Sequence, residues 1–373
     1  MRTVKSLRVI YHGRTVGTLA ATREGKVAFQ YDEQWILNGF SISPFSLPLA
    51  SNVYVPVKDN FEGLFGVFAD SLPDGWGRLL VDRMLRKNGI SSDQITPLER
   101  LGIVGSTGMG ALEYVPELLS IADGQNMSFD EMSEQCRQIM SNKDVEDLDQ
   151  LVKLGGSSGG ARPKALVSID KEDWIIKFPL SMDPQDIGEE EFDYMKCAAK
   201  CGIDVPEVRL FTSELCGGYF GVRRFDRGIC KTHMVSVGAM LETSHRYPNL
   251  DYNDIIKLTY ILTRDDRQVE EIFRRMCFNV FAHNRDDHSK NFSFLYVEDQ
   301  SEWRLSPAYD LTYSQSIGGE HATSVNGNGR DPGMKEIMEV TAKCGLSASW
   351  AKQVAESIDE TVSCDLRKYL HER

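Results

Sequence analysis

The chain has no long uninterrupted apolar run, and without one it is not expected to cross a membrane. It also lacks internal repeats and low-complexity segments, and its 373 residues are enough for two or three domains with cores of their own. Eight cysteines are scattered without a CxxC pair, and Cys197 and Cys201, one helical turn apart, are expected to pack rather than to bond. The first six residues lead into a predicted strand instead of a signal peptide. We therefore expect a cytoplasmic protein with reduced thiols and no membrane partner.

Positive charge is also in deficit. The chain contains 42 Lys and Arg against 55 Asp and Glu, which gives a net charge of −13. Basic residues gather on two predicted helices, near residues 78–87 and 264–275, where we interpret them as solvated faces. No basic stripe stands out, so the chain is not expected to bind DNA by itself.

Carboxylate and amide side chains are concentrated in two short segments near the C-terminal end. Residues 281–291 read FAHNRDDHSKN, and residues 306–311 read SPAYDL. Asp286 is separated by four residues from Asn291, and Asp310 follows nineteen residues after Asn291. In a protein-kinase-like catalytic loop one Asp lies near the substrate hydroxyl, while an Asn and a second Asp hold the metal ions. Asp and Asn also cluster in ordinary turns, so the upstream sequence has to support this interpretation.

Upstream, four glycines and two serines occupy residues 155–160 and are followed by ARPKALV. Such a backbone can approach phosphate oxygens closely and direct N–H groups at them. Residues 165–169 and 174–178 are then predicted to be two strands of a hairpin. Lys177 in the second strand is either an outward-facing strand residue or the cation that contacts the α- and β-phosphates of a nucleotide.

The next segment, residues 188–199, begins acidic and becomes amphipathic, as the start of a helix should. Two interpretations of its acidic residues remain open. Glu191 would pair with Lys177 and hold it in place, or the three glutamates 189–191 would only complement the helix dipole.

The order of these motifs resembles the HipA family, whose members are bacterial Ser/Thr protein kinases that act as toxins in toxin–antitoxin pairs. The motifs that carry the resemblance are SSGGARPK (157–164), WIIKFP (174–179), EEEFDYM (189–195), RRFDR (223–227), NRDDHSKNFSF (284–294) and SPAYDL (306–311). The resemblance covers nearly the whole chain, because residues 7–17, 42–49 and 66–75 are similar to that family's small β-rich domain.

The resemblance implies an α+β fold: a two-lobed protein-kinase-like unit, with a β-rich N-lobe and a helical C-lobe, preceded by a small β-rich N-terminal domain. We place the N-terminal domain at 1–115, the N-lobe at 155–228 and the C-lobe at 229–373. Residues 116–154 would be a polar connecting segment, with a turn at 123–126. Apolar spacing predicts helices at 75–87, 255–262, 269–281 and 350–370, and alternation predicts a strand at 110–116. The glycines of 102–110 lack the strand and helix of a dinucleotide site, so we interpret them as a structural turn.

The resemblance also implies roles for single residues. Asp286 would orient the acceptor hydroxyl, Asn291 and Asp310 would hold Mg²⁺, and Lys177 would contact the phosphates of ATP. The predicted nucleotide-binding residues are Gly156, Ser157, Ser158, Gly159, Gly160, Lys177, Arg224, Phe225, Asp226 and His288. Of these, residues 224–226 would lie at the adenine side and act through backbone groups, whereas His288 would either contact phosphate or hydrogen-bond to the backbone.

In the HipA family the kinase phosphorylates a serine of its own Gly-rich loop and thereby switches itself off. Ser157 is in register with that serine, and Ser158 is the adjacent alternative. Nearly two negative charges in a loop that receives phosphate would disfavour nucleotide binding.

Two positions depart from the family pattern. Arg223 stands where an acidic residue is expected, and Asp287 replaces a small residue beside the catalytic Asp. Asp287 would either assist the metal or cap the loop, and we favour the cap. Residues 321–330, with the turn sequence NGNG, follow where kinases place their activation segment and are expected beside the active site.

We therefore predict an ATP- and Mg²⁺-dependent Ser/Thr kinase toxin that causes growth arrest and persistence. Its expected target type is an aminoacyl-tRNA synthetase, and its expected partner is a HipB-like helix-turn-helix antitoxin that alone contacts operator DNA. The alternatives are a small-molecule or lipid kinase and a non-catalytic co-repressor. The presence of Lys177, Asp286, Asn291 and Asp310 argues against the non-catalytic alternative.

Overall fold

The computed structural model describes residues 4–119 and 127–371. The chain forms two compact units: the first comprises residues 1–185, 211–235 and 239–243, and the second comprises residues 186–210, 236–238 and 244–373. The domain boundaries predicted after residues 115, 154 and 228 stay predictions. The turn predicted at 123–126 lies outside the described residues.

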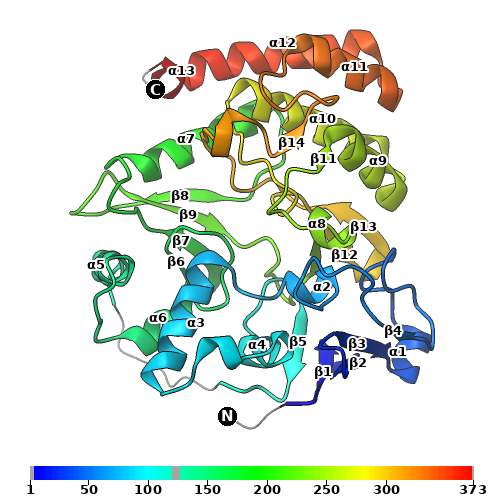
Figure 1. The fold of residues 1–373 in the computed structure, drawn as a ribbon. Coiled ribbons are helices and arrows are strands. Elements are labelled where there is room, and N and C mark those ends of the chain that lie inside the picture. Colours follow the sequence, from blue (N-terminus) through cyan, green and yellow to red (C-terminus); the bar gives the residue numbers. More distant parts are fainter. Residues whose placement is uncertain (1–3, 120–126, 372–373) are drawn as a thin grey trace. The chain divides into compact units, whose positions relative to one another are not determined.

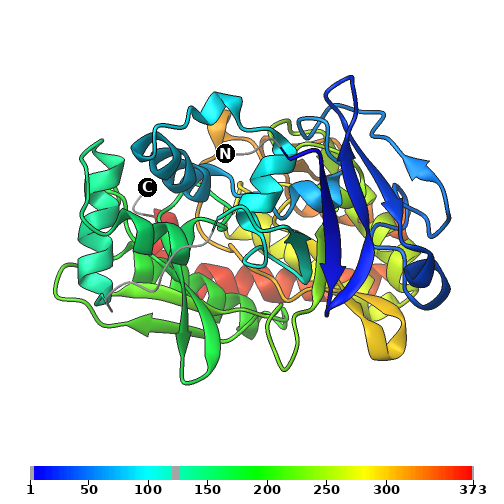
Figure 2. The ribbon, with the colours of Figure 1, turned by 90° about the horizontal axis from the view of Figure 1, so that it is seen from below.

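The N-terminal part of the first unit contains a five-stranded antiparallel sheet (Figures 1 and 2). Its strand order is β4-β3-β2-β1-β5. One face is apolar because buried side chains such as Leu7, Val9, Leu19 and Phe29 recur along the strands. The strands are β1 (Ser6–Tyr11), β2 (Arg14–Ala21), β3 (Val27–Tyr31), β4 (Val53–Tyr54) and β5 (Leu112–Val115).

The described part of the first unit contains seven helices, and those that start at residues 33, 97 and 129 have a side-chain cap. The helix at 97–104 starts with a reciprocal capping box between Thr96 and Glu99 and has Pro at its first position. The helix predicted at 75–87 has those bounds. The helices are α1 (Glu33–Asn38), α2 (Gly66–Ala69), α3 (Gly75–Lys87), the 3₁₀ helix η1 (Ser92–Gln94), α4 (Pro97–Val104), α5 (Phe129–Met140) and α6 (Leu148–Gly155).

A second antiparallel sheet of the first unit contains the predicted hairpin. The strands that lie in the first unit follow the order β6 (Lys164–Ile169), β7 (Glu172–Lys177) and β9 (Tyr219–Arg223). The hairpin turns through Asp170 and Lys171, both with positive φ (53° and 69°), as a tight two-residue turn requires. Helices α3 and α6 cover this sheet, since Trp76, Leu80 and Val152 share one apolar cluster with Trp174 and Ile176 (Figure 1). The predicted hairpin is confirmed.

The second unit is mostly helical, and it also contains two small strand pairs. Helix α10 packs against α9 and α12, and α12 packs against α11 and α7 (Figure 1). Strands β12 and β13 form an antiparallel hairpin, and β11 and β14 form a short parallel pair. The elements are α7 (Ile187–Lys200), β11 (Leu250–Asp251), α9 (Tyr252–Thr263), α10 (Asp266–Phe281), β12 (Ser293–Val297), η2 (Glu298–Gln300), β13 (Glu302–Leu305), η3 (Ile317–Gly319), β14 (Thr323–Ser324), α11 (Met334–Cys344), α12 (Ala348–Asp365) and α13 (Arg367–His371).

Three elements lie where the chain passes from one unit to the other: β8 (Val208–Phe211), β10 (His233–Ser236) and α8 (Val237–Met240). Separate antiparallel sheets and a helical unit together make an α+β fold, as predicted. Within residues 4–119 and 127–371, no helix combines the length and the apolar character needed to span a membrane.

Candidate active site

The Gly-rich segment of the first unit connects α6 to β6, and the hydroxyls of both its serines are turned onto the backbone. Ser157 Oγ donates a hydrogen bond to the carbonyl of Thr107 (2.9 Å), and Ser158 Oγ donates to the carbonyl of Gly155 (2.6 Å). Ser157 is 6% exposed. The predicted phosphorylation site is therefore held inside the first unit by a residue of the segment between α4 and β5.

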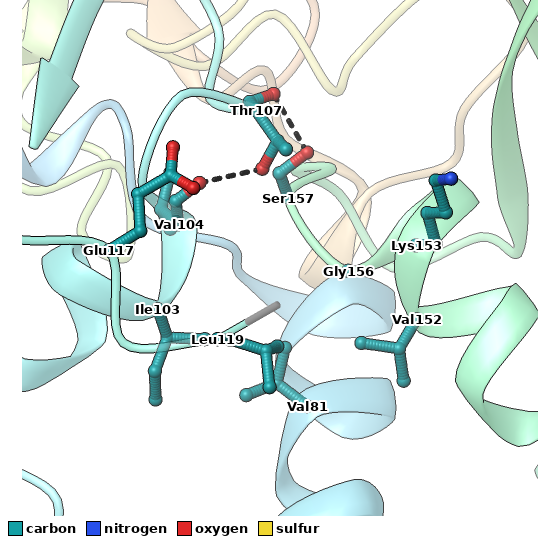
Figure 3. Close-up of a pocket in the computed structure, with 10 residues that line it drawn as sticks. All are labelled: Val81, Ile103, Val104, Thr107, Glu117, Leu119, Val152, Lys153, Gly156 and Ser157. Atoms are coloured by element: carbon teal, nitrogen blue, oxygen red, sulfur yellow. Dashed lines mark hydrogen bonds between the residues drawn. The ribbon is translucent and has the colours of Figure 1, made fainter. Parts of the chain in front are cut away.

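A cavity of about 200 Å³ lies beside this segment (Figure 3). Ser157 and Thr107 line one side of it, and Val81, Leu119 and Val152 line the other. Half of the ten described residues that line it are aliphatic, and among these ten the one basic residue, Lys153, is matched by one carboxylate, Glu117. This lining suits apolar atoms better than a triphosphate. The predicted phosphate contacts of Gly156 and Ser157, which both line the cavity, stay predictions.

Lys177 lies at the end of β7, between Ile176 and Phe178, which are both buried. Because side chains alternate along a strand, Lys177 points to the face opposite to these two residues. Its ammonium nitrogen is 5.4 Å from the centre of the Phe220 ring, a distance at which a cation is attracted by an aromatic face. Both predicted roles of Lys177, and its pairing with Glu191, stay predictions.

The segment after β9 contains a buried ion-pair network. Arg224 binds Asp226 through two hydrogen bonds of 2.9 and 2.8 Å, and Arg227 donates a third of 2.8 Å. The amide of Gly110 also donates to this carboxylate. Burial by itself would raise the pKa of Asp226, but the charges of Arg224 and Arg227 outweigh it and hold that pKa below its usual value.

This network fixes the segment that precedes β5. Arg227 donates to the carbonyls of Gly108 and Gly110, and therefore holds the end of the glycine-containing stretch 102–110. Residues 105–110 of that stretch form a turn, as predicted, whereas residues 102–104 are the end of α4, which the turn interpretation missed. The side chains of Arg224 and Asp226 have structural partners, so any nucleotide contact near them has to use the backbone; the predicted contacts of residues 224–226 stay predictions. The structural role of Arg227 was not predicted from the sequence, although the residue lies in the RRFDR motif.

The predicted catalytic loop follows α10 in the second unit. Asn291 Nδ2 donates to the backbone carbonyl of Asp286 (2.7 Å), and the amide of Asn291 donates to the carbonyl of His288 (2.8 Å). The Asp286 side chain is 62% exposed, and His288 Nε2 lies 4.0 Å from its Oδ1. Asp286, His288 and Asn291 therefore lie together in one loop, and the Asp286 carboxylate faces solvent.

The segment with Asp310 is tied to the same loop. The hydroxyl of Tyr309 donates to the carbonyl of Lys290 (2.6 Å) and lies within hydrogen-bond distance of Ser293 Oγ. Asp310 itself has a positive φ of 54°. This strained backbone directly follows the Tyr309 anchor, which holds the second predicted metal ligand beside the catalytic loop.

A carboxylate and an amide match the chemistry of Mg²⁺, which prefers oxygen ligands and keeps several waters. Among residues 4–119 and 127–371, no group of three or more His, Cys, Asp or Glu side chains is arranged to hold a metal. Mg²⁺ on a nucleotide does not require such a group, because phosphate oxygens supply part of its coordination.

Asp287, directly after the predicted catalytic residue, is buried and surrounded by donors. It is 1% exposed. Its Oδ2 accepts from the hydroxyl of Tyr252 (2.7 Å) and lies 3.0 Å from His321 Nδ1, and its Oδ1 accepts from the amide of Thr323 (3.1 Å). Both carboxylate oxygens thus have protein partners, which supports the capping role over the metal role.

The network around Asp287 extends into α10 and into the segment after Asp310. Asn279 Nδ2 donates to the Tyr252 hydroxyl (2.8 Å), and Thr323 Oγ1 donates to the carbonyl of Asp287 (2.6 Å). The amide of Ala322 also donates to the carbonyl of Arg285 (3.0 Å), so residues 321–323 lie beside the predicted catalytic loop. The expected place of the whole segment 321–330 beside the active site stays a prediction. Tyr252 and Asn279 were not predicted from the sequence, and His321 was predicted only as part of the segment 321–330.

Two family models match the chain. Residues 156–365 match the HipA-like C-terminal domain, and residues 7–115 match the HipA N-terminal domain. The first match alone covers more than half of the 373 residues. The chain belongs to the HipA family.

Curated relatives in Sinorhizobium fredii (strain NBRC 101917 / NGR234) include two proteins with kinase names. The chain is 31% identical to "Putative kinase Y4dM" over 209 residues, which is 51% of this chain and 49% of that protein. It is 28% identical to "Putative kinase Y4mE" over 343 residues, which is 83% of this chain and 77% of that protein. The match to the first relative thus spans about half of that protein's length.

Among solved structures, the chain resembles one from the HipA, HipB and operator DNA complex of the Shewanella oneidensis MR-1 toxin–antitoxin system. The TM-score is 0.71 at 17% identity, with 98% of this chain and 90% of that chain covered. At this identity the likeness concerns the fold, which confirms the predicted kinase-like α+β class of the HipA family.

Proposed function

We propose that this HipA-family protein is an ATP- and Mg²⁺-dependent Ser/Thr protein kinase and the toxin of a toxin–antitoxin module. The observation that carries the proposal is the loop at 284–291. The Asp286 carboxylate is exposed, while its backbone carbonyl accepts a hydrogen bond from the Asn291 side chain. The next residue, Asp287, is buried and anchors the loop in the interior. The kinase names of the two relatives support the same activity.

In this proposal each residue has one task. Asp286 accepts a hydrogen bond from the acceptor hydroxyl and orients it, Asn291 and Asp310 hold the metal, and Lys177 contacts phosphate oxygens. Bound ATP with Mg²⁺ supplies the phosphoryl group and neutralises the charge on it. Because the chemistry is mainly positioning, the buried anchors behind the loop contribute to it by keeping Asp286 in place.

We further propose that Ser157 is phosphorylated by the kinase itself, with Ser158 as the adjacent alternative. Phosphorylation removes the hydroxyl proton that Ser157 donates to Thr107, and a phosphate with nearly two charges does not suit a side chain that is 6% exposed. Modification therefore requires the segment to leave the position seen here, and it would disfavour nucleotide binding afterwards.

The partners follow from the family. The solved Shewanella chain comes from a complex of HipA, HipB and operator DNA, which supports a helix-turn-helix antitoxin as partner here. A net charge of −13 supports DNA contact through that antitoxin rather than through this chain. We expect an aminoacyl-tRNA synthetase as target, growth arrest as outcome and the cytoplasm as location.

The test is incubation of purified, initially unphosphorylated protein with radiolabelled ATP and Mg²⁺, with Asp286→Ala beside it. We expect label on Ser157 or Ser158, located by mass spectrometry, and none in the variant. Asp299→Ala, an exposed aspartate of η2, is the control and should retain the label. Bound nucleotide without label would favour a small-molecule or lipid kinase, and no bound nucleotide would favour a co-repressor.

A further inference from the structure

The Gly-rich segment is held by the start of α3, which belongs to the part of the chain that matches the HipA N-terminal domain. Asp74, the residue that precedes α3, accepts a hydrogen bond from the amide of Gly160. The amide of Trp76 donates to the carbonyl of the same Gly160 (2.9 Å). Both backbone polar groups of Gly160 are therefore bound by residues that precede it by more than eighty positions.

The backbones of the two segments approach each other so closely that only glycine fits. A Cβ on Gly77 would lie 2.5 Å from the carbonyl oxygen of Ser158, and a Cβ on Gly75 would lie under 3.0 Å from that of Gly160. Gly75 also has a positive φ of 41°. These two glycines thus permit a direct backbone contact along residues 158–160.

Trp76, between these glycines, anchors the contact in the core of the first unit. It is fully buried in the cluster that includes Trp174 and Ile176 of β7, and its indole Nε1 donates to the carbonyl of Lys164 (3.1 Å) at the start of β6. The Gly-rich segment is therefore attached at Gly160 and at Lys164 to one rigid helix start.

We propose that Asp74 is a positioning residue for nucleotide binding, and that residues 74–77 hold the Gly-rich segment in the conformation that receives the phosphates of ATP. The inference rests on the proposed kinase function and extends its nucleotide site into the N-terminal domain. A segment with four glycines in six residues loses much conformational freedom when it becomes ordered. Holding Gly160 before the nucleotide arrives removes part of that cost from binding.

Two variants separate this role from simple charge repulsion between Asp74 and phosphate. Asp74→Ala removes the acceptor for the Gly160 amide, whereas Asp74→Asn keeps an oxygen acceptor and removes the charge. Positioning predicts that Asp74→Ala weakens nucleotide binding and that Asp74→Asn largely preserves it. Repulsion predicts that both variants bind nucleotide more tightly.

The experiment is titration calorimetry of the full chain with ATP and with ADP in the presence of Mg²⁺, with exposed Asp93→Ala as control. We expect the Kd of Asp74→Ala to rise about tenfold, equivalent to about 1.4 kcal/mol and typical of one lost hydrogen bond to a charged group. Asp74→Asn should stay within about threefold of wild type, and Asp93→Ala should match it. Amide hydrogen exchange without nucleotide should become faster at 156–163 in Asp74→Ala only.

The outcomes distinguish the inference from the function on which it rests. If wild type binds nucleotide and Asp74→Ala binds equally or more tightly, the positioning role is wrong and the kinase proposal stands. If Asp74→Ala binds weakly but its exchange at 156–163 is unchanged, positioning is wrong as well. If wild type binds neither nucleotide, the proposed function itself fails.

Discussion

The two adjacent aspartates of the predicted catalytic loop should differ in how much their substitution lowers the stability of the protein. Asp286 is 62% exposed, whereas Asp287 is 1% exposed and accepts from Tyr252, His321 and Thr323. Asp287→Ala leaves these three donors without their acceptor. At about 1–3 kcal/mol for each buried unpaired group, partly offset by relief of the desolvation of the carboxylate, we expect a loss of about 3–5 kcal/mol.

The assay is urea unfolding of Asp287→Ala and Asp286→Ala followed by tryptophan fluorescence, with the exposed Asp299→Ala as control. Asp286→Ala and Asp299→Ala should stay within about 0.5 kcal/mol of wild type, as is usual for surface substitutions. Asp287→Asn keeps acceptor oxygen for part of the network and should lie between wild type and Asp287→Ala. A loss below about 1 kcal/mol for Asp287→Ala would refute the anchoring role, because a buried carboxylate with three partners cannot be removed so cheaply.

Two further predictions concern the first unit. Burial lowers the pKa of His233 to about 4, below the ordinary value of 6.5, and its ring Nε2 contacts the carbonyl of Ile42 (2.9 Å). Below pH 6.5 His233 is protonated in the unfolded chain but stays neutral in the native state, so the free energy of unfolding should fall by about 1.4 kcal/mol between pH 7.5 and 5.5. His233→Gln should lack this decrease when the free energy of unfolding is measured with urea at both pH values. The same decrease in wild type and variant would contradict the prediction. A Cβ on Gly66 would lie 2.5 Å from Ala239 Cα; Gly66→Ala should therefore cost about 1–3 kcal/mol by overpacking, and an unchanged melting temperature would oppose this.

Much of the fold could be predicted from short-range patterns. Alternation identified the hairpin of β6 and β7, and apolar spacing identified α3, α9 and α10. The predicted helix at 350–370 is divided into α12 and α13. The sequence predicted one helix because apolar positions at helical spacing continue past Asp365, where α12 ends. Residues 116–154 were predicted to be a polar connecting segment, but they contain α5 and most of α6. The capping box of Ser128 and Glu131 indicates the start of α5, and the charge-rich composition of the segment drew attention away from it.

The candidate site shows a different limit. The spacing of Asp286, Asn291 and Asp310 was sufficient to group them, because those residues lie within one short loop and its neighbour. Asp287 has the same side chain as Asp286, and its partners are 35 and 36 positions away on opposite sides along the chain: Tyr252 at one end, Thr323 at the other. No local periodicity encodes such a pairing, so the sequence favoured a capping role for Asp287 but could not show which residues bury it. The distinction comes from burial: Tyr252, His321 and Thr323 hold one aspartate in the interior, and the backbone they fix leaves its neighbour facing solvent, where an acceptor hydroxyl can reach it.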